Sequence, residues 1–119
     1  MKNEKFTYDF SQVVILGGGI SGMGAALLAA SRGYNVFLSN RDSLDSAFAK
    51  ALQNQNIAFE SGVHSIDKIL AASVIVKSPG IPDTAAIIVQ AVEAGIPVIS
   101  EIEFAAEHSD ETIVAVTGS

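Results

Sequence analysis

The sequence contains no cysteine and few positively charged residues. Without cysteine it has no disulfide framework, no thiolate metal ligand and no thiol nucleophile. Lysine and arginine together number 7 against 13 acidic residues, which gives a formal net charge of −6. Nucleic-acid phosphates are held mainly by clustered basic residues, so this composition argues against nucleic acid as a partner. A small anion remains compatible, because backbone amides and helix N-termini bind phosphate whatever the net charge.

Long hydrophobic runs are also absent. The apolar stretches around residues 13–16 and 85–89 are far shorter than the roughly 20 residues of a membrane-spanning helix. Residues 1–11 lack the apolar centre and the small-residue cleavage site of a signal peptide. These absences predict a cytoplasmic protein that has no membrane as a partner.

The length and the amino-acid composition of the chain indicate a single folded domain. The chain has 119 residues, of which 49% are hydrophobic and 17% are charged. That length suits one domain with a substantial core, and the low charge suits strands that are covered by helices. Six short β-branched or apolar runs are candidate strands: residues 12–16, 35–38, 57–59, 73–76, 97–99 and 112–116.

Segments with helical spacing separate these runs. Two of them have apolar residues on one predicted face, namely Ile20, Met23, Gly24, Leu27 and Leu28, then Leu44, Ala47, Phe48, Ala51 and Leu52. A shorter helix is expected after Ser65, and another from Pro82 or Asp83. Their predicted inward residues are Ile66, Ile69 and Leu70, and then Ala85, Ile88, Val89 and Val92. Residues 101–107 form a last short helix.

Two glycines mark the expected helix ends. Gly33 and Gly95 stand where a left-handed residue ends a helix before a strand. Alternating strands and helices with short connections predict an α/β, doubly wound, Rossmann-like parallel sheet in three layers, as a single domain. In such folds the ligand lies beyond the carboxyl ends of the strands.

The strongest motif follows the first predicted strand. Residues 17–22, GGGISG, match G-x-G-x-x-G between a strand and a helix, the context in which this motif indicates a phosphate site. Gly17 permits the tight turn, Gly19 lets a phosphate approach the backbone, and Gly22 allows the helix to lie close to the sheet. Free amides near Ile20 and Ser21 are then directed at the anion. The alternative is a purely structural turn.

The end of the second predicted strand argues against NAD. A dinucleotide site has an acidic residue there for the ribose hydroxyls, whereas this chain has Ser39, Asn40 and Arg41. Asp42 lies beyond the strand and is more simply a helix cap. Arg41 can pair with a phosphate or stack on a base, or it can be solvated like most loop arginines.

The loop after the fourth strand supplies a possible wall for the ligand. Residues 77–82, KSPGIP, are expected to form a rigid connection, and the alternative interpretation of Lys77 is a plain surface charge. His64 and His108 are isolated and read as structural, so no metal site is expected. Glu101, Glu103 and Glu107 read as a solvated helix face. No nucleophile–base pair is found, and no catalytic residue is expected.

Four segments together resemble the Mur ligase family: residues 13–22, 78–82, 95–104 and 114–119. The combination of SPGI with IEF is most similar to the D-glutamate-adding branch. The resemblance implies a three-domain enzyme, of which residues 1–111 are the N-terminal domain that holds the UDP-linked substrate. Residues 112–119 then begin the central ATPase domain with a strand and a truncated P-loop that lacks its lysine.

The resemblance also implies the chemistry. The whole enzyme uses ATP and Mg²⁺ to activate the carboxylate of UDP-N-acetylmuramoyl-L-alanine as an acyl phosphate, which D-glutamate attacks. The isolated chain is expected to bind neither cofactor and not to catalyse this reaction. The implied UDP-binding residues are Gly19, Ile20, Ser21, Ser39, Asn40, Arg41, Ser78, Pro79 and Gly80, and Gly118 and Ser119 belong to the ATP loop. The family often has aspartate where Ser39 or Asn40 stands here. The alternatives are the NAD domain of an oxidoreductase and a stand-alone nucleotide sensor.

Overall fold

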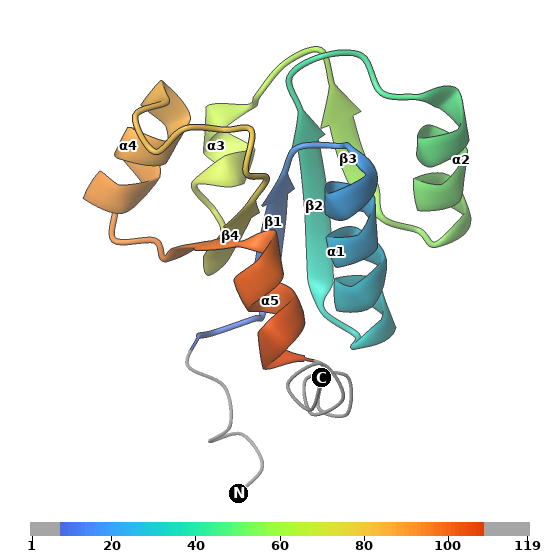
Figure 1. Ribbon diagram of the computed structural model, residues 1–119, viewed down its shortest axis with the longest axis horizontal. Helices are drawn as coiled ribbons and strands as arrows, with labels where there is room; N and C mark the ends of the chain where they lie inside the picture. Colours follow the sequence, from blue (N-terminus) through green and yellow to red (C-terminus); the bar gives the residue numbers. More distant parts are fainter. Residues whose placement is uncertain (1–7, 109–119) are drawn as a thin grey trace, which may run out of the picture.

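The computed structural model describes residues 8–108, which form one layered α/β unit (Figure 1). Strands and helices alternate along the chain, as predicted. In order they are β1 (Gln12–Leu16), α1 (Ile20–Ser31), β2 (Asn35–Asn40), α2 (Ser46–Asn54), β3 (Ala58–Ser61), α3 (Ile66–Ile69), β4 (Val74–Lys77), α4 (Ala86–Glu93), β5 (Val98–Ser100) and α5 (Glu101–Glu107).

The five strands form one parallel sheet in the order β3-β2-β1-β4-β5. The order reverses between β1 and β4, so the loops that follow these two strands diverge at the carboxyl edge of the sheet. A crevice at this switch point is the usual ligand site of a doubly wound fold. The predicted Rossmann-like, single-domain architecture is confirmed for the described residues.

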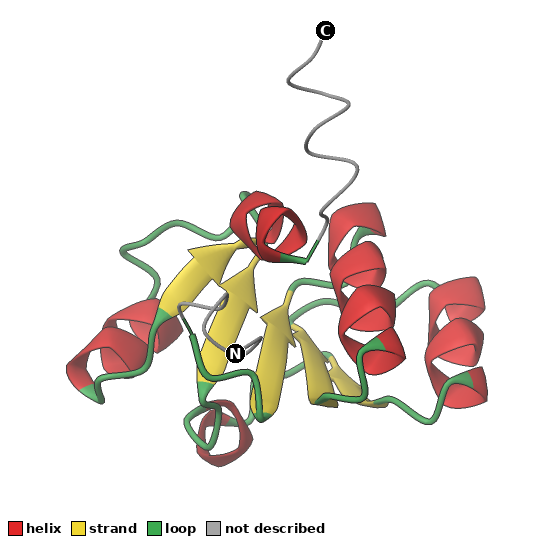
Figure 2. Cartoon of the chain, turned by 90° about the horizontal axis from the view of Figure 1, so that it is seen from below, coloured by secondary structure: helices red, strands yellow, loops and turns green. Residues whose placement is uncertain are grey.

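Alternate residues of the central strand enter two separate cores. Val13 and Ile15 pack with α1, α2 and α5, whereas Val14 and Leu16 pack with α3 and α4. Figure 2 shows the strands between these two groups of helices. This is the predicted three-layer arrangement, and it explains why the apolar run of β1 is continuous: both faces of the strand are covered.

Helix α1 turns a different face to the sheet from the one its large residues predict. The buried residues are Gly22, Met23, Ala25, Ala26 and Ala29, whereas Ile20 is 83% exposed and Leu27 is 39% exposed. The small side chains let the helix axis approach the strands, and α5 lies along its flank. The predicted inward positions of Ile20, Gly24 and Leu27 are therefore wrong.

The helices on the other face also depart from the prediction. Helix α4 begins at Ala86 rather than at Pro82 or Asp83, since residues 82–85 form a turn closed by a hydrogen bond from the amide of Ala85 to the Pro82 carbonyl, 3.0 Å. Val89 and Val92 are exposed, and the buried face consists of Ile87, Ile88 and Ala91. In α3, Ile69 is buried but Ile66 is 44% exposed.

The predicted helix ends are confirmed. Gly33 and Gly95 have φ values of +83° and +82° and follow α1 and α4. The predicted strand at 112–116, together with Gly118 and Ser119, lies outside the described residues. Within residues 8–108, no helix has the length and apolarity needed to cross a membrane.

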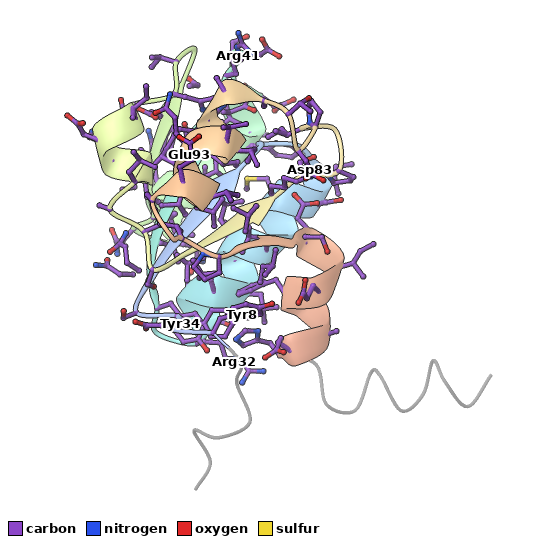
Figure 3. All side chains as sticks on the ribbon, turned by 90° about the vertical axis from the view of Figure 1, so that its left-hand side faces the viewer. Tyr8, Arg32, Tyr34, Arg41, Asp83 and Glu93 are labelled. Carbon is purple, nitrogen blue, oxygen red and sulfur yellow. The ribbon has the colours of Figure 1, made fainter. Side chains whose placement is uncertain are left out.

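An aromatic cluster closes the end of the molecule opposite Arg41. Phe10 stacks on Tyr34 with ring centroids 5.4 Å apart and contacts Phe104 and His108 edge-on. His108 is buried, its Nδ1 lies 2.9 Å from the Phe104 carbonyl and its Nε2 lies 2.9 Å from the Tyr34 hydroxyl. Figure 3 shows Tyr8 and Tyr34 at this end and Arg41 at the other. His108 is structural, as predicted.

Candidate nucleotide-binding site

The glycine turn joins β1 to α1 at the carboxyl edge of the sheet. Gly17 has a φ of +111°, and its amide donates to the Ser39 carbonyl at 3.0 Å. The Gly18 amide donates to Oδ1 of Asn40 at 2.9 Å. A Cβ on Gly22 would lie 1.9 Å from the Gly17 carbonyl oxygen. The turn is therefore tied to the end of β2, and the third glycine of the motif is sterically required.

The start of α1 is open toward solvent. Gly19 is the N-cap residue and no side chain caps the helix. A Cβ on Gly19 would meet no heavy atom within 4 Å, so the space before this helix is free. The first amides of a helix have no intrahelical acceptor and carry the positive end of its dipole. This geometry suits a phosphate group.

The loop after β4 is held rigidly beside the turn. The Ser78 amide donates to the Leu16 carbonyl at 3.0 Å. Nζ of Lys77 donates to the Ile81 carbonyl at 2.8 Å and lies 3.4 Å from a carboxylate oxygen of Asp83. Lys77 thus stabilises the loop through these two contacts, and its interpretation as a plain surface charge is wrong.

These loops enclose a cleft of about 690 Å³ at the switch point. Five of the predicted site residues line it together: Gly19, Asn40, Arg41, Ser78 and Gly80. Two others, Ser21 and Pro79, line an adjoining apolar hollow of about 340 Å³ between α1 and α5. The side chain of Ile20 is exposed. The predicted site residues are thus divided between two pockets.

Ser39 lies behind the wall of the cleft rather than in it. Its side chain is fully buried, and its Oγ lies 2.7 Å from Oε2 of Glu60 and 2.6 Å from Nδ1 of His64. Asn40 accepts from Gly18 through Oδ1 and donates to the Asp42 carbonyl through Nδ2 at 2.8 Å. Both side chains therefore organise the wall, and a direct contact of either one with uridine stays a prediction.

Asp42 also differs from its expected role. The carboxylate that caps α2 belongs to Asp45, which accepts from the Ala47 amide at 2.8 Å. Asp42 instead lines the cleft beside Arg41. The acidic residue nearest to the end of β2 is therefore available to a ligand, although it follows the strand instead of ending it.

Sequence reasoning missed His64 and Glu60. His64 is half-buried and lines the cleft from the loop between β3 and α3, and Glu60 lies near the carboxyl end of β3, opposite Ser39. The rule that ligands lie beyond the carboxyl ends of strands applies equally to β3, and it could have drawn attention to both residues. His64 is part of the cleft as well as of the fold.

Glu101 does not belong to a solvated face. It is 7% exposed, while Glu103 and Ile102 point outward. Within the described residues, Oε2 of Glu101 is buried without a hydrogen-bond partner. Burial raises the pKa of this carboxyl, and a hydrogen bond from the Ser21 hydroxyl lowers it only in part, so the pKa lies above its usual value. Phe104 packs into the core, and this contact orients α5 so that Glu101 faces inward.

Glu101→Gln is expected to stabilise the domain at neutral pH by about 1 kcal/mol, because a buried carboxylate with one unsatisfied oxygen, and with no positive charge among the described residues to pair with, is replaced by a neutral group of nearly the same shape. A raised folded-state pKa means that the unfolded chain releases this proton more readily. Stability is therefore lost as pH rises through the folded pKa, and the advantage of glutamine should disappear below about pH 4. Urea unfolding of both proteins across this range measures the difference. A difference in unfolding free energy that does not change with pH would show that the pKa of Glu101 is not raised in the folded chain.

Among residues 8–108, no cluster of three or more histidine or acidic side chains could hold a metal ion. The sheet order, the glycine turn and the cleft at the switch point together define a Rossmann-like α/β domain with a candidate ligand site at the carboxyl edge of its sheet.

A family model described as "Mur ligase MurD-like, N-terminal domain" matches residues 11–100. The chain belongs to this family. A relative from Cytophaga hutchinsonii, "UDP-N-acetylmuramoylalanine--D-glutamate ligase", is 51% identical over 110 residues, which are 91% of this chain and 24% of the relative. A ligase of the same name from Porphyromonas gingivalis is 46% identical over 116 residues, which are 98% of this chain and 25% of the relative.

The fold is also similar to that of a solved structure. A murein peptide ligase from Psychrobacter arcticus aligns with a TM-score of 0.74 and 21% identity, covering 82% of this chain and 20% of that one. At this identity the likeness shows the fold alone. The chain spans about a quarter of the length of the curated relatives it matches.

Proposed function

We propose that this domain holds the UDP portion of UDP-N-acetylmuramoyl-L-alanine for a ligase that adds D-glutamate. The observation that carries the proposal is the uncapped start of α1 at Gly19, which opens onto the cleft between the β2 and β4 loops. A diphosphate fits there because free amides and the helix dipole both favour an anion. The family and the names of the relatives support the choice of substrate.

In this proposal each loop has its own part. The amides at Gly19, Ile20 and Ser21 hold the diphosphate, and uridine lies between Asn40–Arg41 and the wall formed by Ser78, Pro79 and Gly80. Ser39 acts from behind the wall. ATP, Mg²⁺ and D-glutamate bind mainly to the part of the ligase that corresponds to the other three quarters of the relatives' length. Gly118 and Ser119 of this chain contribute to the ATP loop. Residues 1–111 form the substrate domain, 112–119 begin the next one, and the ligase works in the cytoplasm. The chain alone does not catalyse the reaction.

Titration with UDP tests the proposal, with NADH as the competing ligand. We expect amide NMR shifts from UDP at Gly18, Gly19 and Arg41, and weak binding, because the chain spans only about a quarter of the length of its relatives. A response to NADH alone would favour the oxidoreductase alternative, for which Asp42 would supply the ribose ligand. A folded chain that responds to neither nucleotide would refute the proposal.

Arg41→Ala is expected to weaken UDP binding by roughly fivefold, or about 1 kcal/mol, because an exposed arginine gains a screened contact with the diphosphate or the base. Isothermal titration at fixed salt measures the change. Lys50→Ala is the matched control, because Lys50 is also an exposed cation but lies on α2 and does not line the cleft. Equal losses in both variants would indicate a general charge effect and no specific role for Arg41.

A further inference from the structure

Three polar side chains form a continuous chain from the interior to the cleft. Glu60 lies on β3, Ser39 lies opposite it on β2, and His64 follows in the β3–α3 loop. Oγ of Ser39 lies 2.7 Å from Oε2 of Glu60 and 2.6 Å from Nδ1 of His64. These contacts leave the other edge of the imidazole as the one that can meet a ligand.

Glu60 is the fixed acceptor of this chain. Its Oε2 accepts from the Ser65 amide at 2.6 Å, and its Oε1 accepts from the Ser65 hydroxyl at 2.5 Å. Burial raises the pKa of Glu60, but the hydrogen bonds from Ser65 and Ser39 outweigh this effect and hold the pKa below its usual value. Glu60 is therefore ionised at neutral pH and can only accept hydrogen bonds.

The number of protons then fixes the histidine tautomer. Ser39 has one hydroxyl proton, and the carboxylate of Glu60 is its strongest acceptor, ahead of the Val63 carbonyl at 3.3 Å. If that proton pointed to His64 instead, two bare oxygens would face each other at 2.7 Å. Nδ1 of His64 must therefore donate to Ser39, so in the neutral ring Nε2 is a bare acceptor.

The surroundings of His64 keep the ring neutral. Burial lowers its pKa, Arg41 lowers it further, and Glu60 opposes both effects without reversing the direction. Asp42 lines the same cleft, and Lys68 on α3 acts on Glu60. A neutral ring with Nδ1 committed to Ser39 presents an acceptor to the cleft, whereas the neighbouring Arg41 side chain presents only donors.

We propose that His64 determines nucleoside specificity: its Nε2 accepts a hydrogen bond from an N–H or O–H donor of the bound nucleoside, while Ser39 and Glu60 are the positioning residues that fix its tautomer. The inference rests on the proposed binding of UDP. The donor is either the N3–H of uracil, which cytosine lacks, or a ribose hydroxyl. The chain Glu60–Ser39–His64 thereby replaces the acidic residue that ends the second strand in dinucleotide sites.

Binding of nucleotide analogues tests this role. His64→Phe keeps a flat ring but has no acceptor, and we expect its affinity for UDP to fall by about fivefold to tenfold. The ligands are UDP, CDP, 2′-deoxy-UDP and 3′-deoxy-UDP. The analogue that lacks the donor bound by His64 should bind wild type and variant with equal affinity. That analogue therefore identifies the donor. The inference is overturned if UDP binds both proteins equally, or if all four ligands lose affinity by the same factor. Failure of the wild type to bind UDP would instead refute the proposed function.

The tautomer can be read without any ligand. The sequence has 2 histidines, so His64→Phe assigns the ¹⁵N side-chain signals. We expect a protonated Nδ1 and a bare Nε2 for His64 at neutral pH. His108 is an internal reference, because its Nδ1 faces a carbonyl and must also be protonated. Ser39→Ala should increase the Nε2–H form of His64 only. A wild-type His64 that is protonated at Nε2 would overturn the inference even if the variant unfolds.

Discussion

Replacing Gly22 with alanine is expected to destabilise the domain by about 3 kcal/mol or more and to leave little folded protein. The added Cβ would lie 1.9 Å from the Gly17 carbonyl oxygen and 3.0 Å from its carbon. Neither atom belongs to a flexible side chain, and Gly17 is itself fixed by the hydrogen bond that its amide donates to the Ser39 carbonyl. The clash can be relieved only if α1 moves away from β1, which separates buried residues of the first core.

Gly24→Ala is the matched control on the same helix. No heavy atom lies within 4 Å of its Cβ position, and alanine in a helix is more favourable than glycine by about 0.5–1 kcal/mol. Gly24→Ala should therefore stabilise the chain while Gly22→Ala unfolds it. Urea denaturation followed by circular dichroism compares the two. Similar stabilities would show that the close contact at Gly22 is readily relieved.

The strands and their order along the chain are predictable because each local run agrees with the global fold. The runs are short, β-branched and bounded by glycine, and the helices between them require parallel strands. The inward face of α1 was not predictable from the same rules. Hydrophobicity selects Ile20 and Leu27, but the sheet selects Ala25, Ala26 and Ala29, because a close approach of helix and strand needs small side chains. That requirement depends on the neighbouring strand and not on the helix sequence.

The parts of the candidate site that the sequence predicts are those whose position depends on a single strand. Position at or just after the ends of β1, β2 and β4 is enough to select candidate residues, and five of these line the cleft. The Ser39–Glu60 contact depends on the register between β2 and β3, which no single strand encodes. The burial of Glu101 depends on how α5 lies against α1. Contacts between elements distant in sequence account for what the local patterns missed.

Gly19→Ala is the second change with a large expected effect, and it acts on binding rather than on folding. Gly19 has an extended backbone with φ −79° and ψ −170°, which alanine adopts without strain. Its Cβ would point into open space. The cost to stability should be at most about 1 kcal/mol, because alanine is a poorer helix cap than glycine.

In the proposed complex that open space holds the diphosphate, so the methyl group of alanine should reduce UDP affinity by about tenfold or more. Isothermal titration measures this loss, and urea unfolding confirms that the variant is folded. Unchanged affinity would mean that no phosphate approaches Gly19, and would move the site away from the start of α1. Gly22 and Gly19 stand three residues apart in one motif, yet the structure gives them separate roles: Gly22 is required for packing, and Gly19 leaves room for the ligand. A glycine motif indicates a binding site only when both requirements are met.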